Sequence, residues 1–279
     1  MRILILTDIH ANLNALKAVF ARLDELRPDI IISLGDQVNY GPYPKETLAL
    51  LRDKQVFMLM GNHEERLLRL RVDGESTFDT YNWSLMHFTF NALKGETFLY
   101  PRELRFGRYF FTHNMPGDLF KELDPADTEE FTAIAKALPQ GVDRYFSGHV
   151  HVSWQIQSHG ITFRNSGSTG CYDGARGLLA GWHFIDDNGL VETHQTPYDP
   201  TGLKQAFISS SAARMAPEFA RLVMHQIETG EHKSFRKFIA LAAQTGLEWH
   251  TREAFRLAAE EFPWTSSLST EAYWQKGEA

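Results

Sequence analysis

Histidine, aspartate and asparagine side chains recur in this sequence directly after short apolar runs, where they could hold metal ions. Asp8 and His10 follow one such run, Asp36 follows another, and His149 and His151 follow a third. In an extended chain, residues two apart point to the same side, so Asp-x-His and His-x-His each offer two ligands to one cation. The full set of candidate metal ligands is Asp8, His10, Asp36, Asn62, His113, His149 and His151, with His63 beside them.

This donor set limits the metal and its chemistry. Carboxylate, amide and imidazole donors without a thiolate favour Mn²⁺, Fe or Zn²⁺ over Ca²⁺, and we expect Mn²⁺, with Ni²⁺ and Mg²⁺ as further alternatives. The carboxylate of Asp36 suits a bridge between two ions. Two cations about 3.5–4 Å apart suit phosphoester hydrolysis, because they supply a metal-bound hydroxide near neutral pH and neutralise the charge of the phosphate.

Each of these residues also has a purely structural interpretation. Gly35-Asp36 on its own is more often a plain turn, Asp8 could cap the helix that follows, and Asn62 could be a helix N-cap. His87 is more often a packed or surface residue than a ligand, and we assign it no role. Because such positions recur at several strand ends of one chain, a shared metal site is the favoured interpretation.

The elements that must position these residues begin with alternating strands and helices. Apolar runs over residues 2–7, 30–34 and 56–60 predict buried strands, and the patterns over 12–26 and 44–52 predict helices. Strand–helix–strand units of this kind form parallel sheets. Candidate ligands at the carboxyl ends of such strands lie where open α/β sheets bind their ligands.

From residue 104 the pattern changes to short strands joined by tight turns. Hairpins are predicted at 104–112, 152–164 and 177–196, separated by a helix over 127–138 and a strand over 145–147. A βα half followed by hairpins indicates two sheets packed face to face with helices outside. The aromatic-rich segment 76–100 is expected to be helical, either in the core or over the mouth of the site.

The chain is predicted to divide near residue 200 into a domain over 1–199 and a helical C-terminal extension over 200–279. Predicted helices in the extension are Pro217–Thr229, Lys233–Thr245 and Thr251–Glu261. The extension could cover the site, dimerise or bind a partner. Packing on the outside of the sandwich is the favoured expectation.

The motifs, in chain order, are Asp-x-His, Gly-Asp-x-x-x-Tyr-Gly, Gly-Asn-His-Glu, His and Gly-His-x-His. Over residues 1 to about 196 this set resembles the calcineurin-like metallophosphoesterase superfamily. The stretch Asn165-Ser166-Gly167-Ser168 resembles the Asn-Pro-Gly-Ser of its small bacterial and archaeal phosphodiesterase-like branch. The resemblance implies an α/β fold, a four-layer α/β/β/α sandwich with a dimetal site at one edge, to which the helical appendage is added.

Carried over motif by motif, the resemblance assigns the ligands to two metal ions. Asp8, His10 and His151 would bind one ion, Asn62, His113 and His149 would bind the other, and Asp36 would bridge them. His63 matches the histidine that protonates the leaving oxygen, so the expected catalytic residues are Asp36 and His63.

Three departures from the family pattern bear on the substrate. Asn39-Tyr40-Gly41 stands where serine/threonine protein phosphatases and symmetrical diadenosine tetraphosphatases have Asp-Arg-Gly, so their phosphate-gripping arginine is absent. Candidates for a substitute are Arg164, Arg176 and Arg108. Asn114 follows His113 where the small members have glycine, and this bulkier residue is expected to reshape the pocket. The third departure is the helical extension, which lies outside the resemblance.

Composition limits the partners and the compartment. The formal net charge of −7 over 279 residues argues against broad binding to nucleic acid or anionic membranes, although nucleic acid is not excluded as a substrate. The lone cysteine, Cys171, the lack of a spanning apolar run and the lack of a signal peptide predict a cytoplasmic protein. Oligomerisation through the C-terminal helices stays open.

The sequence thus predicts a dimetal phosphoesterase that acts on phosphodiesters or small nucleotide phosphoesters, with a small molecule as its substrate. The alternatives are a phosphomonoesterase, a dinucleoside polyphosphatase or a protein phosphatase-like enzyme. A metal-stabilised interaction scaffold is the less favoured reading.

Overall fold

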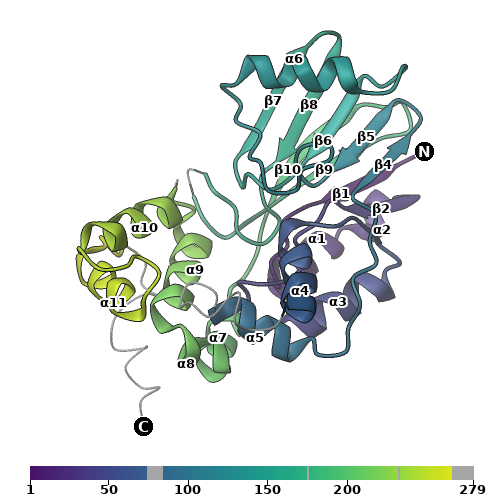
Figure 1. Ribbon diagram of the computed structural model, residues 1–279. Helices are drawn as coiled ribbons and strands as arrows, with labels where there is room; N and C mark the ends of the chain where they lie inside the picture. The colour runs from purple at the N-terminus through teal and green to yellow at the C-terminus, as the bar shows by residue number, and fades with distance from the viewer. Residues whose placement is uncertain (74–83, 175, 232, 266–279) are drawn as a thin grey trace.

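The computed structural model describes residues 1–73, 84–174, 176–231 and 233–265, and this part of the chain forms two five-stranded sheets with surrounding helices (Figure 1). Sheet A has the order β10-β9-β1-β2-β3 and sheet B has the order β4-β5-β6-β8-β7. The strands of sheet A are β1 (Ile3–Leu6), β2 (Ile30–Ser33), β3 (Phe57–Met58), β9 (Leu179–Ile185) and β10 (Val191–Pro197). The strands of sheet B are β4 (Glu103–Phe106), β5 (Tyr109–Thr112), β6 (Arg144–Ser147), β7 (Ser153–Ser158) and β8 (Ile161–Ser166).

The helices lie on the outer sides of the two sheets and along one end of the molecule (Figure 1). They are α1 (Leu13–Phe20), α2 (Leu23–Leu26), α3 (Pro44–Asp53), α4 (Asn62–Asp73), α5 (Ser84–Ala92), α6 (Thr128–Ala137), α7 (Leu203–Ser209), α8 (Ser211–Met215), α9 (Pro217–Thr229), α10 (Ser234–Gln244) and α11 (Arg252–Glu261). Within the described residues, no helix is both long and apolar enough to cross a bilayer.

Strand β1 lies at the centre of sheet A. It is parallel to β2, with Ile3 opposite Ile30, and antiparallel to β9, with Ile3 also opposite Ile185. All four residues of β1 are buried, which fits an unbroken Ile-Leu-Ile-Leu run covered on both faces. The parallel strands β1, β2 and β3 therefore end together at one edge of the sheet.

Three apolar clusters separate the layers. Ile5 of sheet A and Phe146 of sheet B belong to the cluster between the sheets. The opposite face of sheet A packs through Leu6 against α1 and α3, and the opposite face of sheet B packs through Phe163 against Phe131 of α6. This arrangement confirms the predicted four-layer α/β/β/α sandwich.

Several element boundaries differ from the prediction. The helix expected over 12–26 is divided into α1 and α2, because Ala21 and Arg22 interrupt it. Only Phe57–Met58 of the expected strand 56–60 pairs as β3. Of the aromatic-rich segment 76–100, helix α5 is observed, whereas residues 76–83 lie outside the described residues.

The C-terminal extension is helical, as predicted, and α9, α10 and α11 begin and end within about one residue of the predicted bounds. Helices α7 and α8 were not predicted. Leu203 of α7 and Phe219 of α9 are buried in the same apolar cluster as the helical side of sheet A. The extension therefore shares a core with the sandwich, while the division at residue 199 remains a prediction.

Candidate metal centre

All seven predicted ligands meet at one end of the sandwich, in loops that follow strands of both sheets. They come from the loop after β1 (Asp8, His10), the loop after β2 (Asp36), the start of α4 (Asn62), the end of β5 (His113) and the loop after β6 (His149, His151). Within the described residues, His, Asp and Glu side chains with metal-ligand spacing form the groups Asp8–His10–His151, His10–Asp36–His63 and Asp36–His113–His149. In each group the potential ligand atoms lie within 4.8 Å of one another.

The first group has the geometry of a cation site. His10 Nε2 lies 3.0 Å from His151 Nε2, and Asp8 Oδ1 lies 3.5 Å from His151 Nε2 and 3.8 Å from His10 Nε2. Asp8 Oδ1 is buried and has no hydrogen-bond partner among the described residues. A buried carboxylate oxygen without a donor is costly, and a cation among these three atoms would satisfy it. The residues present therefore fit a metal ion.

The predicted ligands of the second ion, Asn62, His113 and His149, are arranged around the side-chain oxygen of Asn62. This Oδ1 lies 2.9 Å from His113 Nε2 and 2.9 Å from His149 Nδ1. If the amide were rotated, its NH₂ would instead donate to the same two nitrogens and to Asp36 Oδ2. A cation between the ring nitrogens and Oδ1 makes the orientation with the oxygen inward the favourable one. This group fits a second metal ion.

Asp36 lies between the two groups. Its Oδ2 is 3.4 Å from His113 Nε2, 4.0 Å from His10 Nε2 and 3.6 Å from His63 Nε2. Its Oδ1 accepts a hydrogen bond of 2.9 Å from the backbone N–H of His63. A carboxylate with one oxygen anchored and the other facing ligands of both groups is suited to bridge two cations.

The protonation of the ligands follows from burial and from the carboxylates. Burial lowers the pKa of His10 and His149 to about 4, so both rings are neutral and offer lone pairs near pH 7. Burial also opposes the charged form of His113, but the charge of Asp36 and a hydrogen bond to it raise the pKa of this ring to about 9. Burial raises the pKa of Asp8, but the hydrogen bond from His151 and the neighbouring histidines outweigh it and lower the pKa to about 2. The carboxylate is therefore ionised near pH 7.

The backbone of the ligand loops is left-handed rather than extended. The φ angles are 51° at Asp8, 49° at His10, 53° at Asp36 and 67° at His149. Such angles are uncommon for non-glycine residues, and each costs about 1–3 kcal/mol unless the surrounding structure imposes it. The β1 loop is tied to the β2 loop by hydrogen bonds from Asp8 N to the Gly35 carbonyl (3.1 Å) and from His10 N to the Asp36 carbonyl (2.9 Å).

The predicted extended geometry of the Asp-x-His and His-x-His pairs is therefore wrong. Asp8 does not cap α1 either, because the N-cap is Asn12, whose side chain accepts from Ala15 N at 3.1 Å. The ligands of each pair converge through left-handed turns after β1 and β6, not through strand alternation. Gly148 is required in the β6 turn, since a Cβ there would collide with Thr7 and Asp8.

His63 lies in the first turn of α4, and its side chain faces the predicted metal ligands. Its Nδ1 lies 2.7 Å from Asn39 Nδ2, and Thr89 Oγ1 lies 3.3 Å from Asn39 Oδ1. An amide that donates to Nδ1 leaves the ring proton on Nε2, which is the nitrogen 3.6 Å from Asp36 Oδ2. Burial lowers the pKa of His63 well below its ordinary value. The ring is therefore a neutral donor directed into the site.

Glu64 was not predicted to have a role, yet it joins two ligand loops. Its buried carboxylate accepts hydrogen bonds from the backbone N–H groups of Asp36 (2.9 Å), Gln37 (2.9 Å), Val38 (3.3 Å) and Gly61 (3.0 Å). Burial, then the charge of Asp36, raises the pKa of Glu64 above its ordinary value, whereas the backbone N–H groups of Asp36 and Gly61 lower it and favour the carboxylate. The signal in the sequence was its place in Gly-Asn-His-Glu, directly after two site residues.

The small polar stretch Asn165-Ser166-Gly167-Ser168, which begins in the last two residues of β8, also supports the ligand loops. Asn165 Nδ2 donates to the Gly148 carbonyl at 2.7 Å, and Ser168 Oγ donates to the Asp8 carbonyl at 2.6 Å. These contacts hold the backbone of the β1 and β6 loops in position. The stretch acts on the metal centre through that backbone.

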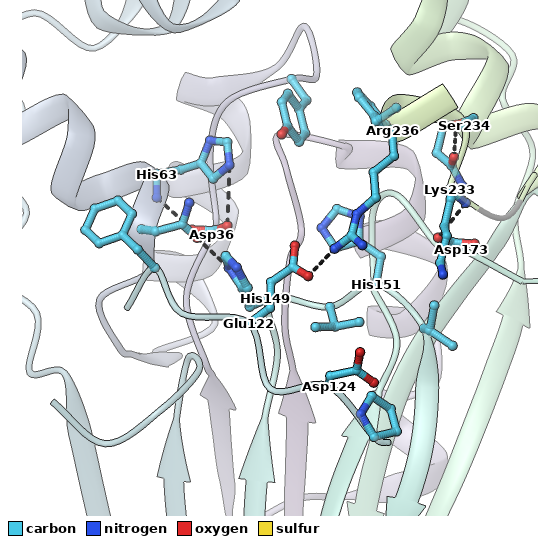
Figure 2. A pocket seen from close by; sticks show the side chains of 18 of the residues that line it. Asp36, His63, Glu122, Asp124, His149, His151, Asp173, Lys233, Ser234 and Arg236 are labelled. Carbon is cyan, nitrogen blue, oxygen red and sulfur yellow. Dashed lines mark hydrogen bonds and ion pairs between the residues drawn. The ribbon is translucent and has the colours of Figure 1, made fainter. Parts of the chain in front are cut away.

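A cavity of about 540 Å³ opens beside the metal centre (Figure 2). Its floor is formed by the ligands, and its walls include Arg66 of α4, Phe120 and Glu122 of the loop between β5 and α6, and Phe235 and Arg236 of α10. The extension packs on the outer, helical side of sheet A, as expected, and α10 in addition contributes to the wall of the pocket.

Tyr40 connects the extension to the ligands. Its ring centroid lies 4.5 Å from that of His10 and 4.8 Å from that of His63, and on its other side it stacks on Phe235 of α10 at 5.4 Å. Phe219 of α9 contacts the same ring at 6.1 Å. The residue that replaces the family's arginine thus carries an aromatic contact between the metal centre and α10.

The arginines suggested as substitutes for the missing one lie elsewhere. Arg108 pairs with Asp143 at the β4–β5 hairpin, Arg164 is half-buried in β8, and Arg176 is exposed and is not among the residues that line the cavity. Among the residues that the structure describes, the arginines in the pocket wall are Arg66 and Arg236.

Asn114 is buried rather than exposed in the cavity. Its amide donates to the Lys121 carbonyl, and its own carbonyl accepts from Tyr145 OH at 2.5 Å. Asn114 therefore holds the loop that carries Phe120 and Glu122. These two residues, and not Asn114, line the pocket.

Comparisons with known proteins agree with this geometry. A family model described as calcineurin-like phosphoesterase matches residues 1–153, which contain all seven predicted ligands. The uncharacterized protein MJ0912 of Methanocaldococcus jannaschii is 26% identical over 171 residues, or 59% of this chain and 68% of the relative. Serine/threonine-protein phosphatase 1 of Salmonella typhimurium is 36% identical over 74 residues, which are 25% of this chain and 33% of that protein.

Solved structures share the fold well beyond the matched segment. A metallophosphoesterase from Sphaerobacter thermophilus superposes with a TM-score of 0.65 at 24% identity, covering 80% of this chain and 99% of the other. The hypothetical protein PH1004 from Pyrococcus horikoshii superposes with a TM-score of 0.66 at 16% identity, covering 83% and 99%. At these identities the likeness concerns the fold.

Proposed function

Because this chain belongs to the calcineurin-like phosphoesterase family, we propose that it is a dimetal enzyme that hydrolyses phosphodiesters or small nucleotide phosphoesters. The observation that carries the proposal is the position of Asp36, whose Oδ2 faces His10 of one ligand group and His113 of the other. Two bound cations would activate a water molecule as the nucleophile and neutralise the charge of the phosphate. Mn²⁺ is the metal we expect, since the donors are carboxylate, amide and imidazole groups.

The residues of the chain have separate tasks in this reaction. Asp8, His10 and His151 would hold one ion, and Asn62, His113 and His149 the other. His63 is oriented by Asn39, and its imidazolium form would donate the proton on Nε2 to the leaving oxygen, which leaves a neutral imidazole. The walls of the cavity would contact the parts of the substrate that surround the reacting phosphate.

The test uses protein stripped of metal and the two esters bis(4-nitrophenyl) phosphate and 4-nitrophenyl phosphate. We expect no turnover without metal, restored turnover with Mn²⁺, and a preference for the diester. Asp36→Asn should lose metal-dependent turnover, whereas Asp187→Asn, at a surface pair with the N-terminus, should keep it. Full activity of Asp36→Asn, or activity that survives metal removal, would refute the proposal.

A phosphatase or dinucleoside polyphosphatase is the second candidate. The specific observation in its favour is the presence of Arg66 and Arg236 in the pocket wall, where they can attract a phosphate with more negative charge. A strong preference for the monoester in the same assay would select this candidate over the first.

A further inference from the structure

We propose that Arg236, from the C-terminal extension, is a specificity-determining residue that binds a second phosphate group of the substrate. The substrate class is then a phosphoester that carries a further phosphate beside the one that is cleaved. This inference rests on the proposed function and extends it to residues outside the family's motifs.

The first support is the position of Arg236. It projects from the first turn of α10 into the wall of the cavity whose floor is the metal centre (Figure 2). Its guanidinium pairs with the carboxylate of Glu122, which comes from the loop between β5 and α6. The pair thus joins the extension to the sandwich across the mouth of the pocket.

The second support is that this pair can be opened by an anion. The side chains of Arg236 and Glu122 are 60% and 51% exposed, and exposed ion pairs contribute only about 0–1 kcal/mol. A phosphate group accepts two hydrogen bonds from one guanidinium, and a chain of phosphates carries more negative charge than one carboxylate. A phosphate in the cavity can therefore replace Glu122 as the partner of Arg236.

The third support is the distribution of charge in the pocket wall. Besides the metal ligands, the wall contains the cations Arg66, Lys233 and Arg236 and the anions Glu122, Asp124 and Asp173. The three cations are matched by the three anions, so these wall residues carry no net negative charge that would repel a phosphate. A substrate with a single diester charge needs only the metal centre, so cations in the wall select for additional phosphates.

Two substrates that differ only in the number of phosphates test the inference. These are the 4-nitrophenyl ester of thymidine 5′-monophosphate and the γ-(4-nitrophenyl) ester of thymidine 5′-triphosphate, compared by kcat/KM for 4-nitrophenol release. We expect Arg236→Gln to lower the ratio of triphosphate to monophosphate ester about tenfold, and Glu122→Gln to raise it, because the competing carboxylate is gone.

Arg256→Gln is the matched control. Arg256 lies on α11 of the same extension and pairs with Glu253 and Glu260 on its own helix, so its removal should leave the ratio and the basal activity unchanged. If Arg236→Gln behaves like Arg256→Gln, the inference is wrong. It is also wrong if Glu122→Gln lowers the ratio as much as Arg236→Gln does.

A binding measurement separates this inference from the proposed function. Calorimetric titration of the Mn²⁺-loaded protein with inorganic triphosphate should give a Kd about tenfold weaker for Arg236→Gln than for wild type. If no ester is hydrolysed but this difference is found, the proposed function fails and the binding role of Arg236 stands. Equal Kd values would overturn the inference whatever the activity.

Discussion

At the scale of single residues, one carboxylate holds the backbone of two ligand loops in position relative to each other. Glu64 receives four backbone N–H groups, three from the loop after β2 and one from Gly61. In Glu64→Gln one acceptor oxygen becomes a donor that faces other donors in a buried site. We expect a loss of about 2–3 kcal/mol in the free energy of unfolding, measured by urea denaturation.

The neighbouring glutamate provides the control for this prediction. Glu65 pairs with Arg69 and Arg102, whose side chains are exposed and remain hydrated without it, so Glu65→Gln should cost no more than about 1 kcal/mol. Equal stability of the two variants would show that Glu64 does not hold the loops.

The donor role of His63 predicts a dependence on the leaving group. His63→Ala should lower kcat by about 10²–10⁴-fold for diesters with poor leaving groups, which need the proton, and by less for 4-nitrophenyl esters. The measurement is kcat over a series of substituted phenyl phosphodiesters. His250→Ala, near the start of α11, is the control with normal rates, and a uniform loss in His63→Ala across the series would argue against proton donation.

The site residues themselves were predictable from the sequence, whereas their backbone was not. Asp, Asn and His after apolar runs, in familiar motifs, identified Asp8, Asp36 and His149 as candidates. Their left-handed angles depend on hydrogen bonds between separate loops, such as Asp8 N to the Gly35 carbonyl. A pattern within one loop carries no information on such contacts, so the extended geometry was the wrong local inference.

At the scale of elements, β9 carries a buried histidine that couples stability to pH. His183 lies between the sheets beside Phe146, and Thr193 Oγ1 is 3.0 Å from its Nδ1. Burial, then the charge of Arg164, lowers the pKa of this ring from 6.5 to about 3. Below pH 6.5 this histidine therefore binds a proton in the unfolded chain but not in the native state. As a result, the free energy of unfolding decreases as the pH falls towards 3.

This coupling gives a measurable slope. Between pH 7.5 and pH 5, His183 should account for a loss of about 2 kcal/mol in the free energy of unfolding. Urea unfolding of wild type and His183→Gln at both pH values isolates this contribution, because the other groups are common to both proteins. If the two proteins lose the same amount, the ring is not held neutral.

The type of an element was predictable where the apolar residues recur with a clear period, as in β1, β2 and α9. The prediction failed where this periodicity is weak. Helices α7 and α8 contain Ser209, Ser210 and Ser211 around their junction, a composition that also suits loops. They fold because Leu203 and Phe207 of α7 and Ala212 of α8 are buried in the core that the extension shares with the sandwich. That burial is a tertiary contact and has no local signature.

At the scale of the whole molecule, the metal ions should stabilise the fold as well as catalyse. The ligands come from both sheets and from α4, so an ion held by them resists separation of the layers. At a free metal concentration of one hundred times Kd, each site should add about 2.7 kcal/mol, or roughly 5–10 °C in Tm for a chain of this size.

Thermal unfolding with a chelator and after return of Mn²⁺ checks this prediction. The shift should shrink in His113→Asn, which removes a ligand of one group, and should persist in His159→Asn, which alters an exposed hairpin turn. A chelator that leaves Tm unchanged would mean that the ligand groups hold no tightly bound ion.

The four-layer architecture could be predicted because the motifs identify a family with one sandwich, but the arrangement of the extension could not. Its contacts with the pocket depend on Phe235 meeting Tyr40 and on Arg236 meeting Glu122, residues far apart in the sequence. Neither pair follows a periodic pattern or a motif. Only the assembled fold shows that the extension and the metal centre share one cavity.

The central position of β1 in sheet A has a consequence for folding during synthesis on the ribosome. Strand β1 lies between β2 and β9, so one of its edges has no partner until residues 179–185 leave the ribosome. At typical translation speeds this wait is on the order of ten seconds or more. During that time the nascent chain exposes an apolar strand edge, which is the kind of surface that chaperones cover. We therefore expect this protein to aggregate most readily while it is bound to the ribosome and β9 has not yet been synthesised.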